Sequence, residues 1–320
     1  MKLASFHADG RDRIGVELWP GAIVDIADLL KQPPADMRTL IEAGTRLLDE
    51  LRIAIEDKRP GARTFSVDAV RWHPPVRTPS KVVCLALNNR ALDKIKIRAP
   101  TDHPAFFLKP FTALTGHKTA IRLRKSYGLT QPEPELAVVI GHMLSNASPE
   151  QAMDAVYGYS IVNDITSVGM REQDSFSVRY FKPGPRPGET TPGEAHTTYP
   201  GRYKASDTFA PMGPWLVTRD EIPDPAALRI ECRLGERLVA SDHTKNYVWA
   251  VAPALSHISQ TMTLLPGDVV SMGTAVGGNE DDPNAPNVPG VTRADLNGFG
   301  GIVSVTIDRI GTLDNSIEMI

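Results

Sequence analysis

The chain has 320 residues, of which 41% are hydrophobic and 23% charged, as in ordinary globular proteins. Its 35 basic residues oppose 38 acidic ones, giving a net charge of −3 without a basic cluster, which excludes nucleic acid as a partner. No apolar run approaches the roughly 20 residues of a membrane-spanning helix, so a membrane protein is also excluded. The first residues lack the apolar segment of a secretory signal, and Cys84 and Cys232 form no C-x-x-C pair. We therefore expect a cytoplasmic protein with two buried thiols.

Residues 1–75 are predicted to form a small N-terminal domain. Its first 18 residues read as two strands around a turn at Asp9-Gly10, and apolar residues at helical spacing predict one helix over residues 36–59. The proline-rich segment 73–81 is typical of a linker. The second predicted domain is therefore residues 76–320.

From Lys81 onward the sequence is rich in short apolar runs typical of strands. Helices are predicted at residues 148–158, where Ser148, Pro149 and Gln151 form a capping-box pattern, and at residues 249–265. Strands that mostly do not alternate with helices predict an α+β, mainly β, fold. Two Pro- and Gly-rich stretches, residues 181–204 and 277–298, are predicted to be long loops.

Two glutamates open one of the apolar runs, in the string TQPEPELAVVIG (130–141). Glu133 and Glu135 would face the same side of a strand, where their charges repel unless a cation lies between them. Asp164, at the end of another apolar run, is a third carboxylate in an apolar setting. Together they predict an all-oxygen site for Mg²⁺, Mn²⁺ or Ca²⁺. A solvated strand edge and an Asx-turn are the alternatives for the glutamates and the aspartate, respectively.

Other polar residues are candidates for the same site. Lys109 and Lys204 are suited to holding an enolate or oxyanion, with a solvated surface charge as the alternative for each. Gly273 and Thr274 end a strand with backbone amides and a hydroxyl that are suited to binding a carboxylate. His103 is a further candidate catalytic residue for this site. The histidines show no H-E-x-x-H spacing, and no G-x-S-x-G motif occurs, so a zinc protease site and a serine-hydrolase elbow are excluded.

The chain resembles the fumarylacetoacetate hydrolase family, most closely from Lys81 to Ile320. The resemblance rests on the strings PAFFLKP, PEPELAVVIGHMLSNASPEQAMDAVYGYSIVNDIT, YKASDTFAPMGPWLVT, LLPGDVVSMGT and IDRIGTLDNSI. It implies a mixed β-roll core, a homodimer and one bound Mg²⁺, Mn²⁺ or Ca²⁺. It also implies that Glu133, Glu135 and Asp164 are the metal ligands, that Lys204 is the active-site lysine and that Thr274 binds substrate. The implied substrates are β-diketo or 2-oxo acids.

The chain departs from the family pattern at two places. Family hydrolases follow the first core strand with N-Y-x-x-H-x-x-E, whose His and Glu activate water, whereas this chain has Leu92 and Ile95 there. After the metal aspartate it has VGMR, ending in Arg171, a candidate substrate-binding residue, in place of Arg-Asp-x-Gln. An insertion over residues 172–202 then precedes Lys204.

Three hypotheses follow. The first is a metal-dependent hydrolase that cleaves a C–C bond in a diketo acid, with Asp93, His103 or Glu172 as a substitute base. The second is a decarboxylase, tautomerase or dehydratase that acts on a 2-oxo acid through an enolate stabilised by the metal. The third is a binding protein on the same fold without turnover.

Overall fold

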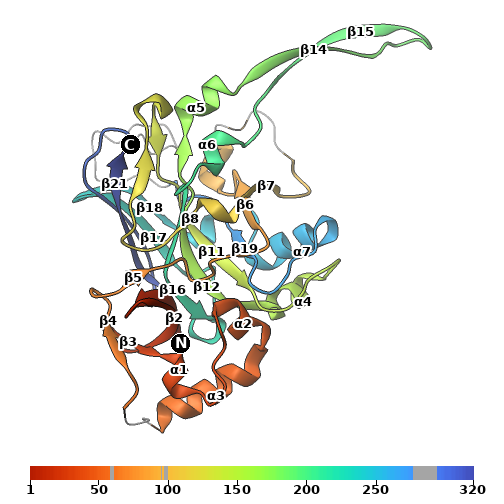
Figure 1. Ribbon diagram of the computed structural model, residues 1–320. Helices are drawn as coiled ribbons and strands as arrows, with labels where there is room; N and C mark the ends of the chain where they lie inside the picture. Colours follow the sequence, from red (N-terminus) through yellow and green to blue (C-terminus); the bar gives the residue numbers. More distant parts are fainter. Residues whose placement is uncertain (58–60, 95, 97–99, 277–293) are drawn as a thin grey trace.

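The structure, a computed structural model, describes residues 1–57, 61–94, 96, 100–276 and 294–320 (Figure 1). More of its residues lie in strands than in helices, and its sheets contain both parallel and antiparallel strand pairs. The α+β, mainly β, fold class predicted from the sequence is therefore confirmed.

The N-terminal unit begins with the predicted hairpin. Strands β1 (Lys2–Ala8) and β2 (Arg11–Trp19) pair antiparallel around Asp9 and Gly10, whose φ angles of 48° and 74° are those of a two-residue hairpin turn. Strands β3 (Ala22–Asp25), β4 (Thr64–Ser66) and β5 (Arg71–Trp72) complete this part of the sheet.

The helix predicted over residues 36–59 is broken into two. Helices α2 (Met37–Glu42) and α3 (Gly44–Glu56) follow the short α1 (Ile26–Leu29), and residues 58–60 lie outside the described part. The single-helix prediction was wrong because Gly44 has a φ of +65°, a left-handed conformation that ends a helix. Apolar side chains of both helices are still buried, as the spacing predicted.

A long sheet runs through the molecule in the order β4-β3-β2-β1-β16-β12-β11-β19-β6-β7. Because β1 pairs with β16, the N-terminal strands continue the core sheet, and the predicted domain boundary at residue 75 stays a prediction. The core strands are β6 (Val82–Ala86), β7 (Ala105–Lys109), β8 (Leu114–Thr115), β11 (Pro134–Ile140), β12 (Val156–Asn163), β16 (Ala210–Thr218) and β19 (Val269–Ser271).

A second sheet has the order β18-β17-β20-β21-β9. Its strands are β9 (Ile121–Leu123), β17 (Arg229–Leu234), β18 (Arg237–His243), β20 (Ile302–Ile307) and β21 (Gly311–Met319). Short strands β10 (Thr130–Gln131) and β13 (Thr166–Ser167) pair with each other. The remaining α-helices are α4 (Pro149–Asp154), α5 (Val168–Gln173), α6 (Arg202–Ala205) and α7 (Val251–Thr261). The predicted capping box at Ser148 and Gln151 is present at the start of α4.

Strand β11 is buried on both faces. Leu136, Val138 and Ile140 belong to one apolar core, whereas the alternate residues Ala137 and Val139 belong to the other, which also holds the apolar side chains of α2 and α3. A strand between two cores has an unbroken apolar sequence, as this one has. Any charged side chain on such a strand lies at its end, where Glu135 is found.

The insertion contains a hairpin of β14 (Phe176–Pro183) and β15 (Thr190–Thr197), which projects away from the body of the molecule (Figure 1). The prediction of a long loop at residues 181–204 was therefore wrong, because regular cross-strand pairing organises this Pro- and Gly-rich segment. Most of the second predicted loop, residues 277–293, lies outside the described residues.

Both thiols are free and buried, as predicted, and burial raises the pKa of Cys232 to about 12. Among the described residues, none of the helices has both the length and the apolar composition required to cross a membrane.

Gly158 allows the close approach of β12 to β16. A Cβ there would lie 2.2 Å from the backbone oxygen of Val217, which cannot move without separating the two strands. We expect Gly158→Ala to lower the free energy of unfolding by roughly 1–3 kcal/mol, measured by urea denaturation. Gly300→Ala is the matched control, because a Cβ there meets nothing within 4 Å; an equal loss in both variants would contradict the packing explanation.

A candidate metal centre of three carboxylates and two lysines

The pairing of β11 with β12 brings the predicted carboxylates together. Glu135 is the second residue of β11 and Asp164 directly follows β12, and the antiparallel register places these strand ends side by side. The backbone N–H of Asp164 donates to the carbonyl oxygen of Glu133 at 2.8 Å, and the N–H of Glu133 donates to Asn163 Oδ1 at 2.9 Å. Local backbone bonding thus fixes all three acidic residues relative to one another.

The three carboxylates form a compact cluster. One oxygen from each of Glu133, Glu135 and Asp164 lies within 4.8 Å of the others. Glu135 and Asp164 are each only 1% exposed, so water does not screen their repulsion, and Glu133 is partly exposed. The alternatives of a solvated strand edge and a strand-end Asx-turn do not describe this geometry. A buried cluster of like charges requires positive charge within it.

Lys204 supplies part of that charge. Its Nζ donates to Glu133 Oε2 at 2.7 Å and to Asp164 Oδ2 at 2.5 Å, and it lies 4.9 Å from the centre of the Phe107 ring. Helix α6 carries this lysine directly after the insertion. The contacts therefore place Lys204 beside two carboxylates of the cluster, and its role as the active-site lysine stays a prediction.

Lys109 lies on the other side of Asp164. Its Nζ is 2.7 Å from Asp164 Oδ1 and donates to the carbonyl oxygens of Phe209, at 2.9 Å, and of Lys204. The residue is 2% exposed, so the alternative of a solvated surface lysine was wrong. Because these contacts occupy its ammonium group, Lys109 is suited to holding Asp164 in position. The sequence predicted instead that Lys109 binds substrate.

Glu135 is oriented from β19 and the residues that follow it. Ser271 Oγ donates to Glu135 Oε2 at 2.6 Å, and the Gly273 N–H donates to the same oxygen at 2.9 Å. Gly273 has a φ of +97°, and a Cβ there would lie 2.8 Å from the Cβ of Asn88. Glycine is therefore required for this backbone N–H to reach the carboxylate.

The electrostatics of the cluster differ from one carboxylate to the next. Burial, and then the charge of Asp164, raises the pKa of Glu135 to about 8. Burial also acts to raise the pKa of Asp164, but the ammonium groups of Lys109 and Lys204 outweigh it, so this pKa is lowered. Burial lowers the pKa of Lys204, but the charges of Asp164 and Glu133 outweigh it and raise this pKa above its ordinary value.

This donor set fits a hard divalent cation. Three carboxylate oxygens converge, and oxygen is the ligand that Mg²⁺, Mn²⁺ and Ca²⁺ prefer. Burial and the charge of Asp164 raise the pKa of Glu135 by more than the charge of Lys204 lowers it, so further positive charge beside this carboxylate would favour its ionised form. A divalent ion beside Glu135 would provide it.

The other predicted site residues lie in different surroundings. Thr274 is partly exposed next to Gly273, and its hydroxyl donates to the carbonyl oxygen of Ala275 at 3.1 Å. Arg171 and Glu172 are exposed on α5.

Two of the proposed substitute bases are engaged with neighbours outside the cluster. Asp93 is exposed and forms an ion pair with Lys96 at 2.8 Å. His103 is paired with Asp102 at 2.7 Å and stacks on His257, with ring centres 5.4 Å apart. Leu92 is buried, and Ile95 lies outside the described residues.

Sequence reasoning missed four residues that touch the cluster: Asn163, Ser271, Phe107 and Gln131, whose Nε2 donates to Glu133 Oε1 at 3.0 Å. Asn163 and Ser271 had a usable signal, since each is a polar residue within or ending an apolar strand. Phe107 had none, because an aromatic residue in a strand is ordinary.

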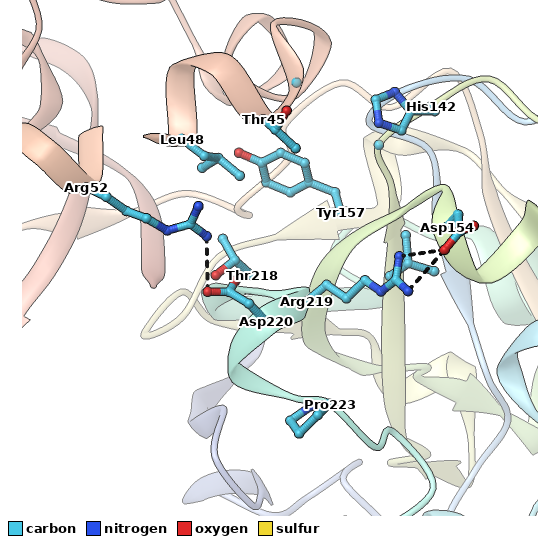
Figure 2. A pocket seen from close by; sticks show the side chains of 13 residues that line it. Thr45, Leu48, Arg52, His142, Asp154, Tyr157, Thr218, Arg219, Asp220 and Pro223 are labelled. Carbon is cyan, nitrogen blue, oxygen red and sulfur yellow. Dashed lines mark hydrogen bonds and ion pairs between the residues drawn. The ribbon is translucent and has the colours of Figure 1, made fainter. Parts of the chain in front are cut away.

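A cavity of about 460 Å³ lies between the N-terminal unit and the core and does not include the carboxylates (Figure 2). Gly141 and Val156, which line the cavity, lie at one end of the β11–β12 pair, and Glu135 and Asp164 lie at the other end. At about 3.3 Å per residue, the two ends are about 20 Å apart along the strands. Ion pairs of Arg52 with Asp220 and of Arg219 with Asp154 lie across the cavity, with Tyr157 near Thr45 and Leu48 (Figure 2). It is therefore separate from the candidate metal centre.

The buried pair of Lys109 and Asp164 predicts a large effect of losing the cation. We expect Lys109→Met to lower the free energy of unfolding by about 3–5 kcal/mol, because it leaves a buried carboxylate short of positive charge. Lys118→Met, which breaks an exposed pair with Asp68, is the control and should cost less than about 1 kcal/mol. Similar losses in urea denaturation would argue against the importance of burial.

Comparison with known proteins assigns the family. Residues 81–318 match the model of the fumarylacetoacetate (FAA) hydrolase C-terminal domain. The chain is 29% identical over 306 residues to the oxaloacetate tautomerase YisK of Bacillus subtilis, covering 94% of this chain and 88% of that protein. It is 27% identical over 319 residues to a 2,4-didehydro-3-deoxy-L-rhamnonate hydrolase of a Sphingomonas species, covering 98% and 94%.

The fold agrees with that assignment. The solved structure of maleylpyruvate hydrolase from Sphingobium sp. SYK-6, in complex with manganese(II) and pyruvate, aligns with a TM-score of 0.71 and 27% identity, covering 100% of this chain and 99% of that one. The family model, over residues 81–318, includes all three carboxylates and both lysines. The chain belongs to the fumarylacetoacetate hydrolase family.

Proposed function

We propose that this protein is a divalent-metal-dependent enzyme that acts on a small 2-oxo acid, with Glu133, Glu135 and Asp164 as the metal ligands and Mg²⁺ as the native ion. The observation that carries the proposal is the convergence of three carboxylate oxygens in a buried site. The solved structure of maleylpyruvate hydrolase, a relative on the same fold, holds manganese(II) and pyruvate.

The bound ion would supply Lewis-acid polarisation of the substrate carbonyl. Lys204 places an ammonium group 2.7 Å from Glu133 and 2.5 Å from Asp164, where it is suited to stabilise negative charge that develops on a substrate oxygen. Ser271 and the Gly273 N–H hold Glu135 in position, and Lys109 does so for Asp164. The partly exposed hydroxyl of Thr274 and the side chain of Arg171 are the proposed contacts for the substrate carboxylate.

Tautomerisation of a 2-oxo acid is the reaction that these residues favour. A base takes a proton from C3, the electron pair of that C–H bond forms the C2–C3 double bond, and the carbonyl oxygen takes up a proton. The reaction needs a proton acceptor, but no water has to be activated as a nucleophile. Leu92, where the family hydrolases have their histidine, is buried and cannot accept a proton. The similarity to an oxaloacetate tautomerase supports oxaloacetate as the first substrate to test.

Hydrolysis of a C–C bond is the second candidate, supported by the similarity to maleylpyruvate hydrolase and to the rhamnonate-derivative hydrolase. It requires a base in place of the missing His and Glu, and Asp93, His103 and Glu172 are the proposed ones. A decarboxylase or dehydratase would use the same metal ligands and Lys204. A binding protein without turnover is the remaining hypothesis.

A homodimer in the cytoplasm completes the proposal. Phe176, Tyr180 and Phe181 are exposed on the projecting hairpin β14–β15. An isolated two-stranded hairpin is marginally stable, so contact with a second copy would stabilise it. Light scattering of the purified chain tests this association.

Metal binding tests the ligand assignment. We expect Glu135→Gln to weaken Mn²⁺ binding by roughly 100-fold or more, because an amide cannot supply the ligand charge, measured from the free Mn²⁺ signal in electron paramagnetic resonance. Glu172→Gln, a change in an exposed side chain, should bind as the unaltered protein does. Equal Mn²⁺ binding by both variants would contradict the proposal that the carboxylate cluster binds the metal.

Product analysis separates the reactions. With Mg²⁺ present, we expect the protein to accelerate exchange between enol and keto oxaloacetate, followed by NMR, and Lys204→Met to slow it by roughly 10²–10³-fold. Acylpyruvate cleavage without this acceleration would favour the hydrolase instead. Loss of cleavage in one of Asp93→Asn, His103→Gln or Glu172→Gln would then identify the base. If neither substrate reacts while Mn²⁺ is bound, the enzyme proposal fails.

A further inference from the structure

A second group of metal-ligating side chains lies in the N-terminal unit. His7 Nδ1 is 2.8 Å from Asp12 Oδ1, and His73 Nε2 is 2.9 Å from the same oxygen. The three ligand atoms lie within 4.8 Å of one another. This group, the His7–Asp12–His73 cluster, shares no residue with the carboxylate cluster.

The strand register builds this cluster from three segments. His7 of β1 lies directly opposite Asp12 of β2, and on its other side His7 pairs with Arg71 of β5, two residues before His73. The backbone N–H of His73 donates to the carbonyl oxygen of Ser5 at 2.9 Å. The ligands are thus held by paired backbone, as in a preorganised site.

The spacing suits a transition-metal ion. Tetrahedral ligands at about 2.0–2.1 Å from Zn²⁺ lie roughly 3.3 Å from each other, so the two nitrogens need to move only about half an ångström from Asp12 Oδ1. Two imidazoles and one carboxylate are donors that favour Zn²⁺ or Cu²⁺ over Mg²⁺. The side chains are 14–43% exposed, so water can fill the remaining coordination positions.

Arg77 orients the carboxylate. Its Nη1 donates to Asp12 Oδ2 at 2.5 Å, which leaves Oδ1 directed at both imidazoles. The positive charge of Arg77 opposes a cation, but the residue is 46% exposed and solvent screens it. Carboxylates that bind a metal ion are usually held in place by such a hydrogen bond.

We propose that His7, Asp12 and His73 bind one Zn²⁺ or a similar transition-metal ion at a site independent of the carboxylate cluster. Such an ion fastens the segment of His73 and Arg77, which leads from the N-terminal unit into the core, onto the β1–β2 hairpin. The two sites differ in donor atoms, nitrogen and oxygen in one and oxygen alone in the other, so they select different metals.

Cu²⁺ is the probe that distinguishes the sites. With untagged full-length protein and excess Mg²⁺ to occupy the carboxylate cluster, we expect one equivalent of Cu²⁺ whose electron paramagnetic resonance spectrum shows coupling to imidazole nitrogen. The Glu135→Gln variant should keep this Cu²⁺ signal. A loss of metal binding at the carboxylate cluster can therefore be distinguished from a loss of binding at the His7–Asp12–His73 cluster.

Histidine variants test the assignment. We expect His7→Gln and His73→Gln each to weaken Cu²⁺ binding by roughly 100-fold. His103→Gln is the matched control because His103 and His257 form another histidine pair, 5.4 Å apart. Circular dichroism checks that the variants fold, and X-ray absorption of the Zn²⁺-loaded unaltered protein provides a readout that needs no variant. Absence of nitrogen ligands in either spectrum, or retention of the signal in both His7→Gln and His73→Gln, would overturn the proposal.

Discussion

The candidate site depends on the balance between buried carboxylates and the two ammonium groups that contact them. One oxygen of Asp164 forms an ion pair with Lys109, and the other accepts a hydrogen bond from Lys204, which also donates to Glu133. Burying a charge without a partner costs several kcal/mol, so these contacts allow the ends of β11 and β12 to remain buried with their acidic side chains. Glu135 is the member that this balance leaves incompletely compensated, and its raised pKa is the consequence.

The contacts of the cluster distinguish residues that hold the carboxylates in position from residues that are accessible to a substrate. Lys109 is surrounded by protein oxygens, and Ser271 is engaged with Glu135, so both stabilise the geometry of the ligands. Lys204 contacts Glu133, the carboxylate that is partly open to solvent, and this contact supports its proposed role at a substrate oxygen. Family membership and this geometry support the proposed chemistry at a 2-oxo group.

The N-terminal unit is integrated with the core through β1 and β16, and the cavity of Figure 2 lies between the two parts. Its His7–Asp12–His73 cluster lies where the chain leaves this unit. Metal binding there would act on the joint between the two parts, whereas the metal proposed at Glu135 would act on the substrate. The two proposals therefore concern different properties of the molecule, its stability and its chemistry.

The sequence by itself determined those features that depend on residues close together in the chain. The β1–β2 turn, the capping box at Ser148 and the apolar strand that contains Glu135 are local patterns, and all are present. The site carboxylates were also predicted from the sequence, because acidic residues at the ends of apolar strands are unusual.

Only the tertiary structure decided which groups meet these carboxylates. Lys109 contacts the backbone of a residue 95 positions away, and Ser271 contacts Glu135 across 136 positions. Local propensity carries no information on such pairs, so a buried lysine and a surface lysine look the same in the sequence. The projecting hairpin and the break at Gly44 were missed for a related reason. Cross-strand hydrogen bonding organised a segment rich in Pro and Gly, and a left-handed backbone conformation overrode a continuous helical pattern.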